Sequence, residues 1–308
     1  MAEISSYEAM ILKSRVDELN IIKKQEDALM KVLTQAHANL SKAMDDIAYP
    51  SDKLKFEHIK DMQQEIERVM DDVYGKRGAF GKGNMQQTII EGATQASKAA
   101  VDGKYKAGML YLKDINPDLI ADLPAMFGGI PDKVVKNLLT RKLDDGQLFS
   151  QRIWKLRDYT DNVVSQTITQ GILESKSARE IAKDLEAFLI QKAEGRAALH
   201  GLPHKQAWHR GDVVYNTQRL ARTEINNAFR EAQVETAKNA SYIKGVKWRL
   251  SVSHPVADIC DTWASQDLYE MGPGCYPPDK APIDHPNGLC FLTDILKTRD
   301  EMMQSMRT

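Results

Sequence analysis

Apolar residues recur with helical spacing over most of this 308-residue chain. Over residues 8–47 they return at every third or fourth position, which predicts one long amphipathic helix. Pro50 ends that helix, and Ser51 is a suitable N-cap for a second helix that stops at Gly75. Together they predict an antiparallel helical hairpin over residues 1–75, serving as architecture or as an arm that docks on a partner. The predicted inward positions are Leu12, Val16, Leu19, Ile22, Leu29, Val32, Ala36, Leu40, Met44 and Ile47, then Leu54, Ile59, Met62, Ile66, Val69, Met70 and Val73.

Residues 76–144 are interpreted as a helical connector. The connector begins within a Gly-Lys-Arg-Gly-Ala-Phe-Gly-Lys-Gly stretch at residues 75–83. This stretch lacks the Gly-Lys-Ser or Gly-Lys-Thr of a phosphate-binding loop and follows no predicted strand, so we interpret it as a linker. Two helices separated by proline-marked turns are expected after it: residues 85–100 and 132–142, with turns around Pro117, Pro124 and Pro131.

Strong helical spacing returns at residue 147 and continues to about residue 172. Ser177 followed three residues later by Glu180 matches a capping box, which predicts the start of another helix. A looser connection over residues 193–210 precedes a helix expected at 212–239. The connection holds His200, His204 and His209, whose spacing matches no zinc template, so we interpret it as a loop.

The pattern changes after residue 240. Residues 242–251 alternate between apolar and basic side chains, which predicts a strand that buries Trp248. Turns rich in Pro and Gly follow, then a short strand at 289–292 and a terminal helix from about Asp294. The predicted fold class is therefore mainly α, with a long N-terminal helical hairpin, a helical middle and a small C-terminal α+β module.

Overall composition names no partner for the chain. The net charge is −1, and charged residues make up 28% of the sequence against 7% for aromatic residues. Residues 151–250 carry an excess of about six positive charges and residues 251–308 an excess of about five negative ones. Either the two segments neutralise one another, or the basic one faces a polyanion such as DNA. Aromatic residues do not alternate with the basic ones, which argues against a base-stacking groove.

The sequence shows no sign of secretion or of a membrane span. The N-terminal residues lack a basic stretch followed by an apolar one, and no apolar run approaches the ~18 residues of a spanning helix. Three widely spaced cysteines do not form a secreted disulfide framework. We therefore expect a cytosolic protein without membrane contacts.

All three cysteines lie in the C-terminal module. Cys260, Cys275 and Cys290 together with His285 form a Cys₃His set, which is acceptable for structural zinc. The separations are irregular, because a strong zinc pattern shows two close pairs of ligands. Buried reduced cysteines and a Cys260–Cys290 disulfide formed in oxidising surroundings remain alternatives.

A charged turn precedes this module in the sequence. Arg222, Thr223 and Glu224 fall on one turn of the helix expected at 212–239. Arg222 is suited to bind a carboxylate or carbonyl oxygens of the loops that follow, and Glu224 is suited to accept backbone N–H groups there. A catalytic Glu224 is the alternative, but no nucleophile or second acid accompanies it at a recognisable spacing. We therefore expect no catalytic residues.

Several separated elements of the second half resemble the phage head morphogenesis domain of Mu F-like minor head proteins. The likeness covers residues 145–293, and we assign residues 145–308 to that domain. The family commonly has a Cys-x-x-Cys pair after the strand and a Cys-Arg-Cys triplet after the His-Pro. This chain keeps only one cysteine of each, because Trp263 and Gly288 stand where the others would be. The matching residues are Phe149, Ser150, Gln151, Arg152, Ile153 and Trp154 at the start, followed by Arg222, Thr223, Glu224, Trp248, Asp258, Ile259, Cys260, Pro282, His285, Pro286, Asn287 and Cys290.

The resemblance implies a non-enzymatic minor capsid protein of a tailed phage. Such a protein would lie near the portal vertex of the virion or procapsid, bind the portal protein, and assist head assembly and DNA packaging or delivery. Scaffold protein, major capsid protein and packaged DNA are further partners that it implies, and assembly would take place in the host cytoplasm. The alternatives are a DNA-binding factor that acts without a capsid and a phage-encoded effector enzyme of the ADP-ribosyltransferase or nuclease type.

Overall fold

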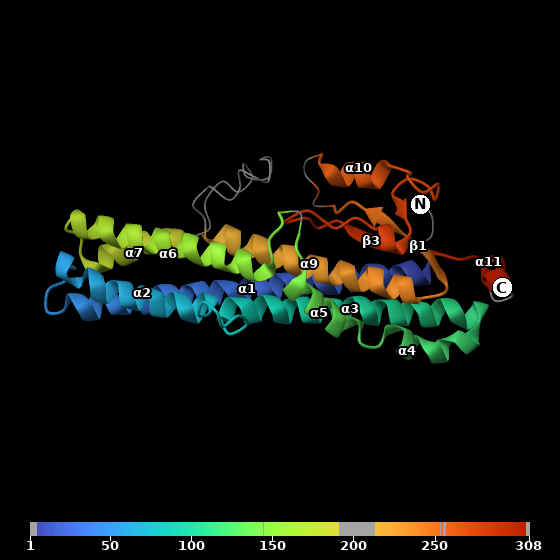
Figure 1. Ribbon diagram of the computed structural model, residues 1–308, viewed down its shortest axis with the longest axis horizontal. Helices are drawn as coiled ribbons and strands as arrows, with labels where there is room; N and C mark the ends of the chain where they lie inside the picture. Colours follow the sequence, from blue (N-terminus) through green and yellow to red (C-terminus); the bar gives the residue numbers. More distant parts are fainter. Residues whose placement is uncertain (1–4, 144, 191–212, 253, 255–256, 306–308) are drawn as a thin grey trace. The chain divides into compact units, whose positions relative to one another are not determined.

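The computed structural model describes residues 5–143, 145–190, 213–252, 254 and 257–305. Over these residues the chain is mainly helical, and a small antiparallel sheet lies near its C-terminal end (Figure 1). The predicted fold class is therefore confirmed. The histidines at positions 200, 204 and 209 lie outside the described residues.

The chain folds as two compact units, each built from separate stretches of sequence. Three long helices contribute to both units: α1 (Ser6–Ala48), α3 (Asn84–Ile115) and α9 (Val213–Asn239). The predicted division into residues 1–75, 76–144 and 145–308 follows the order of the sequence, whereas each unit combines separate stretches, so that division remains a prediction. The first unit comprises Met1–Lys23, Glu91–Leu138 and Arg222–Thr308, and the second comprises Lys24–Ile90 and Leu139–Ala221.

The helices of the second unit pack around buried polar contacts. This unit contains α2 (Ile59–Tyr74), α6 (Phe149–Leu173) and α7 (Ala178–Leu189), besides its parts of the long helices. Arg157 of α6 donates to Asp71 Oδ1 at 2.7 Å and to the Gly75 carbonyl at 2.6 Å. The carbonyl of Gly75 belongs to the residue that ends α2, as predicted, so this arginine holds the end of one helix against the other.

The predicted start of the second helix was wrong. Instead of capping a helix, the Ser51 hydroxyl donates to the Ala48 carbonyl at 2.9 Å, and Lys53 is extended and forms an isolated antiparallel bridge with Ser177. A short 3-10 turn, η1 (Phe56–His58), then leads into α2. The long-range bridge supplies backbone partners that a local capping signal could not foresee.

The capping box at the start of α7 is confirmed. Ser177 Oγ accepts from the Glu180 N–H at 3.3 Å, and Glu180 Oε2 accepts from the Ser177 N–H at 2.8 Å. Just before α7, α6 approaches it closely at Gly171. A Cβ on that residue would lie 2.4 Å from Cγ1 of the buried Ile181, so only glycine fits there.

In the first unit, α1 and α3 are joined to the sheet through a buried ion pair. Lys104 of α3 bonds to Asp294 of the last strand, and both side chains are buried. The Tyr7 hydroxyl of α1 donates to the same carboxylate at 2.6 Å. Burial lowers the pKa of Lys104 and raises that of Tyr7, with the Asp294 charge opposing the first shift and reinforcing the second.

The sheet is three-stranded and antiparallel, in the order β2-β1-β3. Its central strand β1 (Ile243–Arg249) confirms the predicted strand, and β2 (Cys275–Tyr276) flanks it on one side. On the other side β3 (Phe291–Leu296) continues past the predicted end, because Val246 pairs with Asp294 in the ladder. The terminal helix α11 (Arg299–Ser305) therefore begins later than predicted.

Several short elements complete the described part of the chain. Helix α10 (Ile259–Ser265) lies between β1 and β2 in the sequence and was not predicted. Helix α3 is longer than predicted. Within the described residues, no helix is both long and apolar enough to cross a membrane. The other short elements are η2 (Pro117–Asp122), α4 (Leu123–Phe127), α5 (Ile130–Thr140) and η4 (Pro278–Lys280).

One predicted apolar face was wrong. In the first-unit part of α1, Val16 and Leu19 are exposed to 55% and 40%, whereas Ser14, Arg15 and Glu18 are buried. The helix thus turns charged side chains inward where its apolar spacing predicted the reverse. The reason is long-range and lies in the contacts of Arg15.

We expect Gly171→Ala to lower the free energy of unfolding by about 1–3 kcal/mol, because the added methyl overpacks against Ile181. Alanine would otherwise stabilise a helix interior by about 1 kcal/mol, so the sign of the effect is the test. Urea unfolding followed by circular dichroism measures it. In a double-mutant cycle, Gly171→Ala should cost less when Ile181 is also alanine, and a stabilised single variant would contradict the close packing.

Candidate functional site

A row of polar side chains on α9 is buried, although its spacing is that of an ordinary helix face. The four positions are three or four residues apart, so they lie on one side of the helix. None of the four is more than 5% exposed. We call this row the polar stripe, and it consists of Thr223, Asn226, Arg230 and Gln233.

The polar stripe binds the backbone of residues 287–292, which lead into β3 and include its first two residues. The partners follow one another in the same order as the stripe residues, so the segment runs alongside α9 in the same direction. These side chains satisfy backbone groups that would be costly to bury unpaired. Thr223 Oγ1 accepts from the Asn287 N–H at 2.9 Å, Asn226 Nδ2 donates to the Gly288 carbonyl at 3.0 Å, Arg230 donates to the Cys290 carbonyl, and Gln233 Nε2 donates to the Leu292 carbonyl at 3.3 Å.

Asp284 is the anionic centre of this contact. Its buried carboxylate accepts from Asn226 Nδ2 at 3.0 Å and from Arg230 Nη2 at 2.9 Å. It also accepts from the His285 N–H at 2.9 Å, and the Cys260 thiol lies 3.6 Å from it. Asp284 therefore joins α9, α10 and the segment that follows Asp284 in the chain.

The turn after Asp284 needs specific residues. Asn287 has a positive φ of 67°, a conformation that asparagine tolerates better than most residues. A Cβ on Gly288 would lie 2.3 Å from the Asp284 carboxylate, so glycine is required there. Arg222 Nη1 donates to Asn287 Oδ1 at 3.2 Å, and Pro286 beside it is half-buried.

Arg15 brings α1 to the same place. Its guanidinium donates to Asn226 Oδ1 at 2.9 Å, to the Leu289 carbonyl and to Glu18. This contact explains why α1 buries charged residues here. Burial raises the pKa of Glu18 to about 7, and the charges of Arg15 and Arg230 only partly oppose that shift. We call the polar stripe, residues 284–292, Arg15 and Glu18 together the polar junction.

Trp248 covers one side of the polar junction. The guanidinium of Arg230 lies 4.5 Å from the Trp248 ring centroid, within the range of a cation–π contact. Trp263 of α10 packs edge-on against the same ring, with 4.9 Å between centroids. Glu224 is fully buried, with 0% of its surface exposed, so it is not open to a solvent-borne substrate.

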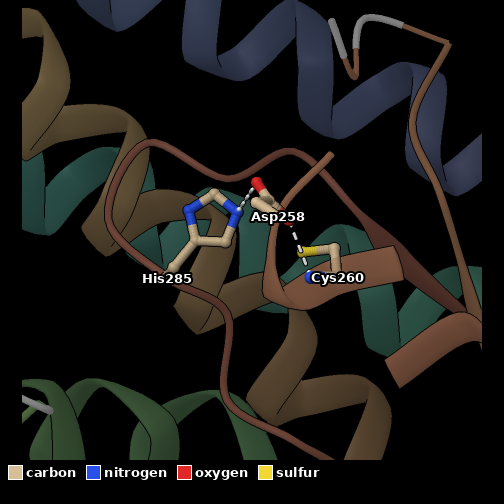
Figure 2. A group of neighbouring side chains, drawn as sticks. All are labelled: Asp258, Cys260 and His285. Atoms are coloured by element: carbon tan, nitrogen blue, oxygen red, sulfur yellow. Dashed lines mark hydrogen bonds and ion pairs between the residues drawn. The ribbon is translucent and has the colours of Figure 1, made fainter. Parts of the chain in front are cut away.

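A second cluster lies next to Asp284 and combines a carboxylate, a thiol and an imidazole. Figure 2 shows the His285 ring turned toward the Asp258 carboxylate, with the Cys260 sulfur beside them. His285 Nε2 is 3.0 Å from Asp258 Oδ2, and one ligand atom from each of the three residues lies within 4.8 Å of the others. Asp258 also caps α10 by accepting from the Cys260 N–H at 2.7 Å.

Cys290 and His254 border this cluster. The interaction between the Cys260 and Cys290 thiols lowers the pKa of Cys290 and, together with burial, raises the pKa of Cys260. His254 Nδ1 lies 4.0 Å from Cys290 Sγ, and its Nε2 lies 2.9 Å from Asp261 Oδ2. Burial works to lower the pKa of His254, but this carboxylate and that of Asp258 outweigh it, and the net shift is upward.

Cys275 lies elsewhere in the module. It sits on β2 opposite Lys247, and its sulfur is 3.6 Å from the Pro273 carbonyl. Within the described residues it belongs to no group of neighbouring metal-ligand side chains, whereas Cys260 and His285 do. All three cysteines are buried thiols without a disulfide bond.

No family model, no curated protein and no solved structure matches this chain.

Sequence reasoning singled out several residues of these sites but missed the most connected ones. Arg222, Thr223, Trp248, Asp258 and His285 all lie in or beside the polar junction or the cluster. The signal available for the missed residues of α9 was the regular spacing of polar side chains, which normally marks a solvated face. The missed residues are Arg15, Glu18, Asn226, Arg230, Gln233, His254 and Asp284.

We expect Arg230→Met to lower the free energy of unfolding by about 3–5 kcal/mol, because it leaves the Asp284 charge buried without its arginine. Arg249→Met is the matched control. That arginine is 42% exposed, pairs with Glu8 at 3.3 Å and donates from Nε to Thr293 Oγ1 at 3.1 Å, so its loss should cost no more than about 2 kcal/mol. Urea unfolding measures both, and equal losses would contradict the central role of Arg230.

The raised pKa of Glu18 predicts a pH-dependent stability. Between its ordinary value of 4.5 and about 7 the folded chain holds a proton that the unfolded chain releases. The resulting stabilisation is complete below pH 4.5 and is lost as the pH rises through 7, a change of about 3 kcal/mol. Glu18→Gln removes this titration.

The unfolding free energy of Glu18→Gln should therefore rise relative to the wild type by about 3 kcal/mol between pH 4.5 and 8. Urea unfolding of both chains across this range gives the difference. Parallel pH profiles for the two chains would show that Glu18 is ionised in the folded state.

Proposed function

We propose that this chain is a non-enzymatic minor head protein of a tailed phage, bound to the portal protein and assisting head assembly and DNA packaging or delivery. One observation supports this best. The C-terminal residues that carry the resemblance to Mu F-like proteins are spread over positions 222–290, yet Arg222, Thr223, Trp248 and His285 all lie in or beside the polar junction and the adjoining cluster. The matching stretch at residues 149–154 belongs to the second unit. A motif whose residues form one packed junction has a structural role that requires no reaction.

The chemistry of the polar junction suits a structural role. Its ionisable groups are buried, with Arg15 and Arg230 facing Asp284 and the Glu18 carboxyl, whose pKa burial raises to about 7. Buried polar contacts can specify one arrangement of a fold more strictly than apolar packing does. An assembly protein needs surfaces held in fixed positions, and this junction fixes α1, α9 and the sheet of the first unit together.

The burial of Glu224 supports the same interpretation. A catalytic carboxylate must come within hydrogen-bond reach of its substrate, and this one is covered on all sides. A hollow of about 1160 Å³ between α6 and α7 is lined by residues such as Gln166, Lys183 and Phe188, and none of the motif residues lines it. A second hollow of about 520 Å³ is lined by Trp248 among others, but Glu224 does not line it.

The test is incorporation into particles. The chain should be found by mass spectrometry in procapsids and filled heads, and it should cross-link to the portal protein. Complementation with Arg230→Met is expected to reduce incorporation at least tenfold, because that change disrupts the polar junction. Arg249→Met should be incorporated like the wild type.

Three results would contradict the proposal. The first is absence of the chain from both procapsids and filled heads. The second is turnover of NAD or cleavage of nucleic acid that Glu224→Ala abolishes. The third is tight binding to free duplex DNA with a steep dependence on salt, in a chain that never enters particles, which would favour a DNA-binding factor.

A further inference from the structure

One thiol, one imidazole and one carboxylate come together where α10 meets residues 284–292, and the thiol of Cys290 lies at the border of this group. They arise as two close pairs in the sequence, Asp258 with Cys260 and His285 with Cys290. Structural zinc sites are commonly built from two such pairs, one from each of two segments that the ion joins. The pairing becomes visible only when Asp258 takes the place that the sequence suggested for Cys275.

We infer that Asp258, Cys260, His285 and Cys290 bind one divalent zinc ion, which cross-links α10 to the segment that the polar stripe holds. Cys275 takes no part in this site. The inference is independent of the role of the chain in particles, because it concerns how the C-terminal module is held together.

The distances are close to those that zinc requires. Zinc binds sulfur at about 2.3 Å and nitrogen or oxygen at about 2.0–2.2 Å, so neighbouring ligands in a tetrahedron are roughly 3.3–3.8 Å apart. The ligand atoms of Asp258, Cys260 and His285 already lie within 4.8 Å of one another. Cys290 lies outside that group of three, and its sulfur is 4.0 Å from His254 Nδ1 at the border of the cluster. A rotation of the Cys290 side chain toward Cys260 would complete the set of four ligands.

The surroundings orient these ligands. His285 Nδ1 lies 3.2 Å from the Pro286 carbonyl, and a hydrogen bond donated to that oxygen places the lone pair of the neutral ring on Nε2, the atom that faces Asp258 Oδ2. The Cys260 N–H holds the Asp258 carboxylate at 2.7 Å. His254 lies 4.0 Å from the Cys290 sulfur on the outer side. Such second contacts fix ligand geometry in metal sites.

The ligand types favour zinc over the hard cations. Two sulfurs and one imidazole suit a borderline-soft ion, whereas magnesium and calcium prefer oxygen ligands alone. Binding releases the thiol protons of Cys260 and Cys290 and involves no change in oxidation state. The region between β1 and β3 has little regular structure, so it would gain much from a cross-link.

Cobalt(II) substitution tests the inference on the full-length chain. The protein is purified under reductant, stripped with a chelator, and titrated first with cobalt chloride and then with zinc chloride. The wild type should bind one equivalent and show thiolate-to-cobalt charge-transfer and tetrahedral ligand-field bands, which zinc then removes. Cys275→Ser, the matched control, should behave in the same way.

Cys260→Ser and Cys290→Ser should each lower the affinity more than about tenfold and weaken the charge-transfer band. His285→Gln keeps both thiols and serves if a cysteine variant does not fold, with lower affinity but retained charge transfer expected. Zinc should also slow hydrogen exchange over residues 258–290 in the wild type. A wild type without a thiolate-to-cobalt band, or a Cys275→Ser variant as impaired as Cys260→Ser, would overturn the inference.

Discussion

The C-terminal part of this protein depends on hydrogen bonds from one helix to an irregular backbone segment. The segment at residues 284–292 has few ladder partners before β3 begins, and the polar stripe of α9 supplies them in order along its length. Each buried group left unpaired would cost about 1–3 kcal/mol, so neither partner can be stable without the other. The close approach at Gly288 and the positive φ of Asn287 follow from this fit.

This constraint extends to parts of the chain that are far away in sequence. Asn226 uses its amide nitrogen for Asp284 and Gly288, so its oxygen needs a donor, and Arg15 of α1 provides one. The contacts of Arg15 keep the charged side of α1 facing inward. Glu18 is then buried, and burial makes ionisation of its carboxyl unfavourable. These contacts hold α1, α9 and the segment before β3 together, which is consistent with the assembly role proposed above.

Asp284 connects the polar junction to the neighbouring cysteines and histidine. Its carboxylate meets Arg230 on one side and the Cys260 thiol and His285 N–H on the other. A zinc ion held by the cluster would reinforce the same segment from its opposite face. The module would then be fixed twice, by hydrogen bonds to α9 and by a cross-link to α10, which compensates for its small sheet.

Sequence alone indicated the long helices, the capping box at Ser177 and the strand at β1, because spacing and capping are local properties of neighbouring residues. It also located the C-terminal block where the special residues meet. It did not indicate α10 or the start of α2. Only the tertiary structure decided that Val16 faces outward, that Arg230 is buried, and that Asp258 rather than Cys275 joins the cluster. Those outcomes depend on partners far apart in the chain, and a polar side chain at helical spacing has the same pattern whether it meets water or a buried backbone.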